Sequence, residues 1–299
     1  MKKYLLSTLI ILCSFPLLAA TATPYETIVT RLKELAKQPN TSLFSLGKND
    51  QDKEIVGIIL GDASKAKTKH LLVGTHHGNE RMAAEVPFHF ANIVLKALND
   101  PSSPDHDKYE NILYYVVPVL NISGYNVNRR EETGADNRNH DSNRDYEDPC
   151  ATKADFGLKS TSLISELIEK EHIIAAVTVH GYVGTFTYPW GVNAEDYRTM
   201  DDALMVDLAK KAVVFNKYKA GTHGGAIYPT AGAFEDWAYY KHGVWSFLLE
   251  IKSASSDLKK DAQAVDAFFK MAPVERSHNI GQTVNCTDRI LRYRDIGRP

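Results

Sequence analysis

Residues 75–80 (Thr-His-His-Gly-Asn-Glu) have the side-chain types and spacing of a metal site. They follow an apolar run at 70–74 and precede a long apolar stretch at 82–98, which predicts a strand end, a tight turn and the start of a helix. His77 and Glu80 are three residues apart across that turn, so an imidazole and a carboxylate can converge on one point. This pair favours zinc, which accepts both ligand types and keeps one position open in catalytic sites.

Such a site needs a third ligand from elsewhere in the chain, and His180 is the best candidate. A His-x-x-Glu pair is short and arises by chance in many proteins, so it predicts little alone. Gly78 strengthens the prediction, because glycine permits a close approach of another part of the backbone.

The elements around these residues predict a single α/β domain, with a mixed, mostly parallel twisted sheet covered by helices on both faces. We predict strands at 54–60, 69–74, 111–120, 173–180 and 244–251, and helices at 24–38, 81–98, 161–171, 200–218, 231–242 and 258–270. Residues 121–158 are polar with little periodicity, and a loop of that length is usually functional. His77, Asn121, His180 and Glu250 lie at or just past predicted strand ends, where α/β sheets carry their sites.

The first 22 residues have the pattern of a secretory signal peptide. Lys2 and Lys3 precede a mostly apolar run, and small residues suit cleavage after Ala20 or Ala22. We therefore expect a catalytic domain at 23–299 that is exported, either periplasmic or secreted. Because no other segment approaches the ~20 apolar residues of a membrane span, we expect no stable membrane insertion after cleavage.

Charge and cysteine content limit the partners and the chemistry. Lys and Arg number 35 against 37 Asp and Glu, and no basic stripe is visible, so nucleic acid is not an expected partner. Without the signal peptide two cysteines remain, Cys150 and Cys286. Export makes a disulfide between them possible, and two free buried thiols are an equal alternative.

Short motifs occur in order between about residues 70 and 252, each of them weak or moderate alone. They are His77-x-x-Glu80, Asn121-x-x-Gly124, Asp141-x-Asn143-Arg144, His180 before Tyr188-Pro189-Trp190-Gly191, Ile227-Tyr228 ahead of Asp236-Trp237, and Glu250, which lies 22 residues beyond Tyr228. Taken together, in this order and spacing, the chain resembles the zinc metallocarboxypeptidases of the carboxypeptidase A type.

The resemblance implies a zinc-dependent carboxypeptidase that hydrolyses the C-terminal amide bond of peptides. One Zn²⁺ would be held by His77, Glu80 and His180, with a position left for water. Metal binding lowers the pKa of that water and polarises a carbonyl group. Glu250 would take the proton of the water as general base and deliver it to the leaving amine as general acid.

The resemblance also implies an arginine that stabilises the oxyanion, and Arg130 matches that position best. Residues 131–140 lie between Arg130 and the motif that contains Asn143. The resulting separation differs from the one expected of short bacterial relatives, so Arg129 and Arg138 remain alternatives. Asp141 resembles the partner that orients a zinc-binding histidine.

The resemblance implies a peptide substrate with a free C-terminal carboxylate. Asn143 and Arg144 would bind that carboxylate, since a guanidinium can donate two parallel hydrogen bonds to it. Tyr228 would cap bound substrate with its hydroxyl. Glu235 stands where the family has a specificity-pocket residue, which favours an amine-bearing side chain such as Lys, Arg or meso-diaminopimelate. Bacterial export would make cell-wall peptides plausible substrates.

Two other functions stay open from the sequence. Residues 74–80 also resemble a Thr-His-Gly-Asn-Glu stretch of the aspartoacylase and succinylglutamate desuccinylase group, which implies a zinc-dependent N-acyl amino acid deacylase. The Tyr228-to-Glu250 spacing argues for the carboxypeptidase instead. A metal-free binding protein on the same scaffold is the third possibility. His76, Trp190 and His223 are interpreted as structural.

Overall fold

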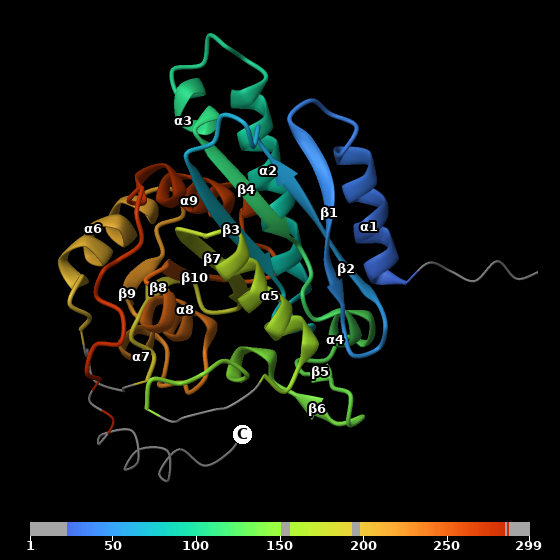
Figure 1. Cartoon of the computed structure of the whole chain (residues 1–299), viewed down its shortest axis with the longest axis vertical. Coiled ribbons are helices and arrows are strands. Elements are labelled where there is room, and N and C mark those ends of the chain that lie inside the picture. The colour runs from blue at the N-terminus through green and yellow to red at the C-terminus, as the bar shows by residue number, and fades with distance from the viewer. Residues whose placement is uncertain (1–22, 151–155, 193–197, 285, 287–299) are drawn as a thin grey trace, which may run out of the picture.

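A mixed sheet of eight strands runs through the molecule (Figure 1). The computed structural model describes residues 23–150, 156–192, 198–284 and 286, and the predicted signal peptide lies outside them. The spatial order of the strands is β1-β2-β4-β3-β7-β10-β8-β9. Their bounds are β1 Thr41–Lys48, β2 Glu54–Leu60, β3 Thr68–Gly74, β4 Ile112–Val117, β7 Ala175–Gly181, β8 Thr185–Tyr188, β9 Lys219–Thr222 and β10 Trp245–Ile251.

The centre of the sheet is parallel. β4, β3, β7 and β10 pair in parallel, as do β8 and β9, whereas β1, β2 and β8 each contribute an antiparallel pairing. Every residue of β4 and β10 is buried, as expected for strands covered on both faces. The predicted fold, a mixed and mostly parallel sheet in one α/β domain, is confirmed.

Helices cover both faces of the sheet. They are α1 Pro24–Leu35, α2 Glu85–Leu98, α3 His106–Glu110, α4 Ile122–Val127, α5 Lys159–Lys170, α6 Asp202–Ala212, α7 His223–Ala226, α8 Phe234–His242 and α9 Leu258–Met271, with 3₁₀ turns η1 Arg81–Ala84 and η2 Ser142–Arg144. Within the described residues, none of these helices is both long and apolar enough to cross a bilayer.

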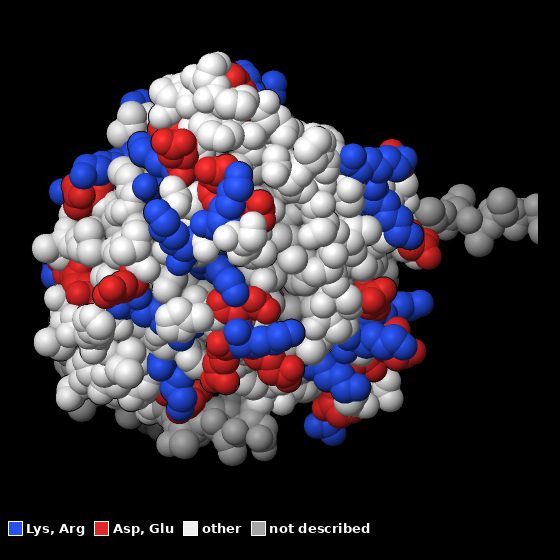
Figure 2. All heavy atoms as spheres, turned by 45° about the horizontal axis from the view of Figure 1, so that its top comes forward, with Lys and Arg blue, Asp and Glu red and all other residues white. Residues whose placement is uncertain are grey.

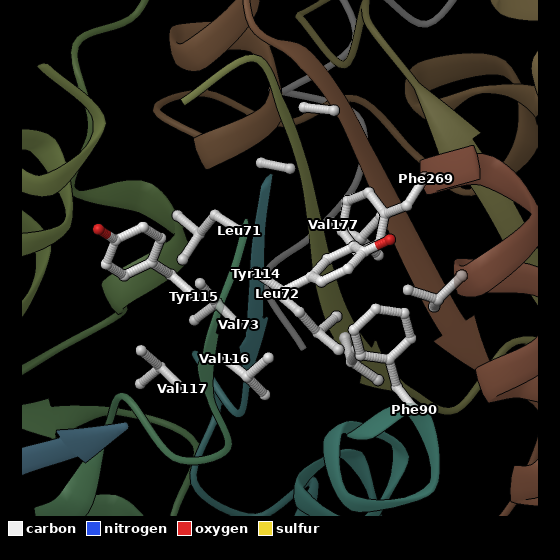
Figure 3. Packing of buried hydrophobic residues seen from close by; sticks show 14 of the residues in the cluster. Leu71, Leu72, Val73, Phe90, Tyr114, Tyr115, Val116, Val117, Val177 and Phe269 are labelled. Atoms are coloured by element: carbon white, nitrogen blue, oxygen red, sulfur yellow. The ribbon is translucent and has the colours of Figure 1, made fainter. Parts of the chain in front are cut away.

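Neighbouring residues of β4 show the two layers of the core (Figure 3). The ring of Tyr114 packs edge-on against Phe90 of α2 and lies 5.8 Å from Phe269 of α9. Tyr115 points to the other face, where its hydroxyl donates to Glu171 at the end of α5 (2.7 Å). The strand alternation therefore places α2 and α9 on one face of the sheet and α5 on the opposite face.

The helices and strands of the structure differ from several sequence expectations. Residues 121–158 were expected to form a long loop, but they contain α4, η2 and a small hairpin of β5 Glu132–Thr133 and β6 Asn139–His140. The helix expected at 200–218 ends at Ala212. β1, β8 and β9 were not expected, because β1 is a half-exposed strand with irregular alternation and the other two are only four residues long.

Two further features bear on the site and on partners. Cys150 and Cys286 form a disulfide, so the alternative of two free thiols is excluded. On the face shown in Figure 2, basic and acidic side chains are interleaved, in keeping with the near balance of charge. The absence of a nucleic-acid partner stays a prediction.

Candidate metal centre and active site

The turn after β3 brings His77 and Glu80 together. The backbone N–H of Glu80 donates to the carbonyl of His77 (3.2 Å), and the N–H of Gly78 donates to the carbonyl of Arg130 (3.1 Å). A Cβ on Gly78 would lie 2.1 Å from the carbonyl carbon of Gly124, a distance that no side chain tolerates. The first turn of α4 therefore packs directly on this turn, and only glycine allows that approach.

The three expected metal ligands converge on one point. The Nδ1 atoms of His77 and His180 are 3.1 Å apart, and Glu80 places Oε1 2.8 Å from the first and Oε2 3.1 Å from the second. Zinc bonds of about 2.0–2.1 Å in tetrahedral geometry set two ligand atoms about 3.3 Å apart. Two imidazole nitrogens that face each other at this distance, beside a carboxylate, fit one shared zinc ion. Among the described residues, this is the group of His, Cys, Asp and Glu side chains placed to hold a metal.

Asp141 orients the ring of His77 from the side opposite the other candidate ligands. Nε2 of His77 lies 3.1 Å from Oδ1 of Asp141, so Nδ1 is the nitrogen that faces the other ligands. Oδ2 of Asp141 accepts from Nε of Arg130 (2.9 Å). The side-chain amide of Asn121 donates to the carbonyls of His76 and Arg130 (3.0 and 2.9 Å). A ligand histidine held by a carboxylate is the usual arrangement around zinc.

The electrostatics favour a cation between these groups. Burial raises the pKa of Glu80, but the charges and hydrogen bonds of His180 and His77 outweigh it and the net pKa is lowered. Burial lowers the pKa of His180 more than Glu80 raises it, which keeps a free nitrogen lone pair. Burial also lowers the pKa of His77, but its hydrogen bonds to the carboxylates of Asp141 and Glu80 raise that pKa overall. An ionised carboxylate with imidazole nitrogens is the donor set of a zinc site.

Glu250 lies beside the three candidate metal ligands. It is the register partner of His180 on the neighbouring parallel strand, so the two side chains leave the sheet on the same face. The carboxylate is buried, and Oε2 has no hydrogen-bond partner. Burial and the nearby charge of Glu80 raise the pKa of Glu250 above its usual range. A carboxylate of raised pKa next to a metal site is suited to accept and release a proton.

The structure separates the three candidate arginines. Arg130 reaches the site, with Nη1 3.8 Å from Oε1 of Glu80 and Nη2 2.9 Å from Asp141. Arg129 turns away and donates to the hydroxyl of Thr133 (2.7 Å). Arg138 is exposed in the turn between β5 and β6. This hairpin accounts for the unusual spacing, because it returns the chain so that Arg130 and Asp141 meet.

Of the residues expected to hold the substrate carboxylate, Arg144 and Tyr228 reach the surface. Nη2 of Arg144 is 3.5 Å from the hydroxyl of Tyr228, a side chain that is 45% exposed. Asn143 is buried, and its Oδ1 accepts the backbone N–H of Phe234 at the start of α8 (2.9 Å).

Glu235 lies on the first turn of α8 and is only 1% exposed. Its Oε1 accepts a hydrogen bond from the hydroxyl of Thr178 on β7, and its Oε2 has no partner. Burial raises the pKa of Glu235 to about 7, against the opposing hydrogen bond from Thr178. The structure therefore brings Glu235 to the same face of the sheet as His180.

Three residues were interpreted as structural. His76 packs against His180 and bonds the hydroxyl of Tyr146 through Nε2 (2.9 Å), and Trp190 packs against Tyr239. His223 also lies near the site, with its ring edge-on to Tyr228. Sequence reasoning missed this proximity, and the one signal for it was the short distance from His223 to Tyr228 along the chain.

Comparison with known sequences gives one family. Residues 28–272 match the family model described as zinc carboxypeptidase. Carboxypeptidase SOL1 of Arabidopsis thaliana is 25% identical over 229 residues, which cover 70% of this chain and 45% of that protein. Carboxypeptidase B of Homo sapiens is 28% identical over 171 residues, or 46% of this chain and 40% of that protein. The chain thus spans less than half the length of these two relatives.

Solved structures share the fold at low identity. Bovine thrombin-activatable fibrinolysis inhibitor, in complex with tick carboxypeptidase inhibitor, superposes with a TM-score of 0.68 at 14% identity, over 82% of this chain and 95% of that chain. The murein-tripeptide amidase MpaA of Escherichia coli O157 gives a TM-score of 0.52 at 15% identity, over 79% of this chain and 94% of that chain.

Proposed function

The chain belongs to the zinc carboxypeptidase family, and on this premise we propose that it removes the C-terminal residue of peptides by zinc-dependent hydrolysis. One observation carries the proposal: the atoms of His77, Glu80 and His180 meet at one point, and Glu250 stands beside them as the register partner of His180. A metal ligand set with an adjacent buried carboxylate is suited to hydrolysis of an amide bond.

The proposed roles follow the positions of the side chains. Zinc, when bound at this triad, supplies Lewis-acid chemistry and activates water. Glu250 takes a proton from the attacking water and delivers it to the leaving amine, as its buried, raised-pKa carboxylate allows. Arg130 is oriented by Asp141 and supplies positive charge where the carbonyl oxygen becomes negative.

The substrate would be held by its free carboxylate. Arg144 offers a planar guanidinium at the entrance, and Asn143 beside it offers an amide. Tyr228 is exposed and within 3.5 Å of Arg144, so its hydroxyl can close over a carboxylate bound there. A terminal carboxylate anchored at this point directs hydrolysis to the last peptide bond of the chain.

The side-chain preference is proposed to come from Glu235. A buried carboxylate oxygen without a partner favours a ligand that brings a donor and a positive charge. C-terminal Lys, Arg or meso-diaminopimelate would satisfy it. This chain shares its fold with the murein-tripeptide amidase MpaA, and cell-wall peptides are accordingly among the proposed substrates.

We also propose export, with residues 1–22 as a cleaved signal peptide and residues 23–299 as the mature catalytic domain in the periplasm or outside the cell. The disulfide between Cys150 and Cys286 supports an oxidising compartment. Mass spectrometry of the protein recovered from a periplasmic extract and from the medium tests both cleavage and location.

The test of the function is a substrate panel for the zinc-loaded protein. It holds peptides that end in Lys, Leu or Glu, a wall peptide with diaminopimelate, and N-acetyl and N-succinyl amino acids. We expect release of the C-terminal residue, fastest from amine-bearing ends, with Glu235→Ala removing that preference. Cleavage of the acylated amino acids alone would indicate a deacylase instead, and a purified protein without zinc would favour a metal-free binding protein.

A further inference from the structure

Two rows of side chains cross the sheet on the face that carries the site. The first row is His180, Glu250 and Thr185, which are register partners on β7, β10 and β8. The second row, two residues earlier on β7 and β10, is Thr178, Leu248 and Thr187. Register partners point to the same face, so the second row lies directly behind the metal ligand and the general base.

The second row is apolar in the middle and polar at both ends. Leu248 is buried at its centre. The two threonines are two strand spacings apart, about 10 Å. A substrate side chain that passes behind the first row would lay its methylene groups on Leu248 and meet a different polar group on each side.

On one side that group is Glu235. Its Oε1 is bound by the hydroxyl of Thr178, and its Oε2 is buried without a partner.

On the other side the group is His223, the first residue of α7, which is 5% exposed. Its Nδ1 lies 3.5 Å from the hydroxyl of Thr187, and its Nε2 is buried without a partner. The threonine hydroxyl can donate to Nδ1, which leaves the ring hydrogen on Nε2 as a free donor. Burial lowers the pKa of His223 to about 3, so the ring is neutral at physiological pH.

Contacts of Arg144 and of its neighbour Asn143 connect the two sides. Nη2 of Arg144 lies 3.5 Å from the hydroxyl of Tyr228, whose ring packs edge-on against His223. On the other side, Oδ1 of the preceding residue Asn143 accepts the backbone N–H of Phe234, which precedes Glu235. Arg144 is also the residue proposed to hold the substrate carboxylate. The side chain of the same substrate residue would therefore extend from Arg144 toward the second row.

We infer that His223 is a second specificity-determining residue and that the site accepts a side chain whose terminal carbon carries two different polar groups. Glu235 pairs with a side-chain ammonium, and His223 donates its Nε2–H to a carboxylate on the same side chain. The chemical class is a C-terminal diamino dicarboxylic acid, such as diaminopimelate, rather than lysine. The inference rests on the proposed function for the placement of the substrate carboxylate.

The test uses three N-acylated dipeptides that differ only in the last residue, which is norleucine, lysine or meso-diaminopimelate. Their binding to the zinc-loaded Glu250→Gln protein is measured by calorimetry, and kcat/KM is measured with Glu250 intact. Each measurement is repeated with His223→Leu, His223→Gln and Glu235→Gln.

We expect the diaminopimelate peptide to bind most tightly. His223→Leu should weaken that peptide alone, by about tenfold to a hundredfold, because the carboxylate loses a buried donor. His223→Gln, which keeps a donor, should restore most of the binding. Glu235→Gln should weaken the lysine and diaminopimelate peptides relative to norleucine.

Two results would overturn the inference. One is a wild-type pocket that binds lysine as tightly as diaminopimelate, or that binds none of the three peptides. The other is an equal loss for all three peptides in both His223 variants, which would show a structural role. Failure of the proposed function gives a different pattern: selective binding that depends on His223, without release of any C-terminal residue by the protein with Glu250 intact.

Discussion

His180 and Glu250 are register partners on the parallel strands β7 and β10, and both side chains leave the sheet on the same face. Neighbouring strands are about 4.8 Å apart, so sheet hydrogen bonds set the spacing between the proposed metal ligand and the proposed general base. Both strands are central and buried. This pair of side chains is therefore positioned by two central, hydrogen-bonded strands of the sheet.

Loss of one ligand should remove the metal. His77→Gln is expected to reduce bound zinc from one ion per chain to almost none, because the Nδ1 that faces His180 and Glu80 is lost. Zinc content after dialysis, measured by atomic emission, checks this. His76→Gln is the matched control, since His76 is the adjacent buried histidine and bonds Tyr146 instead. Loss of zinc in the control but not in His77→Gln would contradict the ligand assignment.

Asp141 should act through His77 and Arg130. In Asp141→Asn an NH2 group replaces one carboxylate oxygen. The residue can then no longer accept hydrogen bonds from both the His77 ring and the Arg130 guanidinium. We expect zinc affinity to fall about 10–100-fold, the usual effect of removing such a partner. Competition with a chromogenic chelator measures the affinity. An unchanged zinc dissociation constant would show that the Asp141 contact does not support the ligand.

Much of this site could be predicted from sequence, and the reason is physical. The ligands and Glu250 lie on or beside apolar strands, whose ends are visible as changes in hydropathy. The β5–β6 hairpin was not predicted, because its strands have two residues each and lie within a polar segment. The choice of Arg130 over Arg129 depended on that hairpin. His223 was missed because its relation to Glu235 arises from register across β7, β10 and β8, which no local pattern encodes.

A buried glutamate away from the site should make stability depend on pH. Burial raises the pKa of Glu132 to about 8, and the hydrogen bond from Ser160 only partly offsets it. Between pH 4.5 and 8 the folded state keeps a proton that the unfolded state has lost. Stability is therefore highest below the unfolded pKa and falls as pH rises through that window, by on the order of 1 kcal/mol per pH unit.

Glu132→Gln should flatten this part of the pH profile. The measurement is the free energy of unfolding in urea at pH 5, 6, 7 and 8. Glu166→Gln is a suitable control because it changes an exposed glutamate on α5. If the wild type and Glu132→Gln show the same slope, Glu132 is ionised in the folded protein, which would contradict this prediction.

The disulfide should contribute measurably to stability. Cys150 and Cys286 are 136 residues apart, and closing a loop of that length stabilises the folded state by about 3–5 kcal/mol through the unfolded chain. The double variant Cys150→Ala with Cys286→Ala should lose that amount in urea unfolding under oxidising conditions. In a reducing buffer the wild type and the double variant should converge, and a wild type that shows no response to reductant would argue against the bond.

The most direct test of the account is the release of a C-terminal lysine from a peptide by the zinc-loaded protein and by Glu250→Gln, with zinc content measured on the same samples. The account predicts one zinc ion in each protein, release by the wild type, and a rate lower by about 10²–10⁴-fold in the variant. Equal rates in two proteins with equal zinc would contradict it, because the carboxylate beside His180 would then have no part in the reaction.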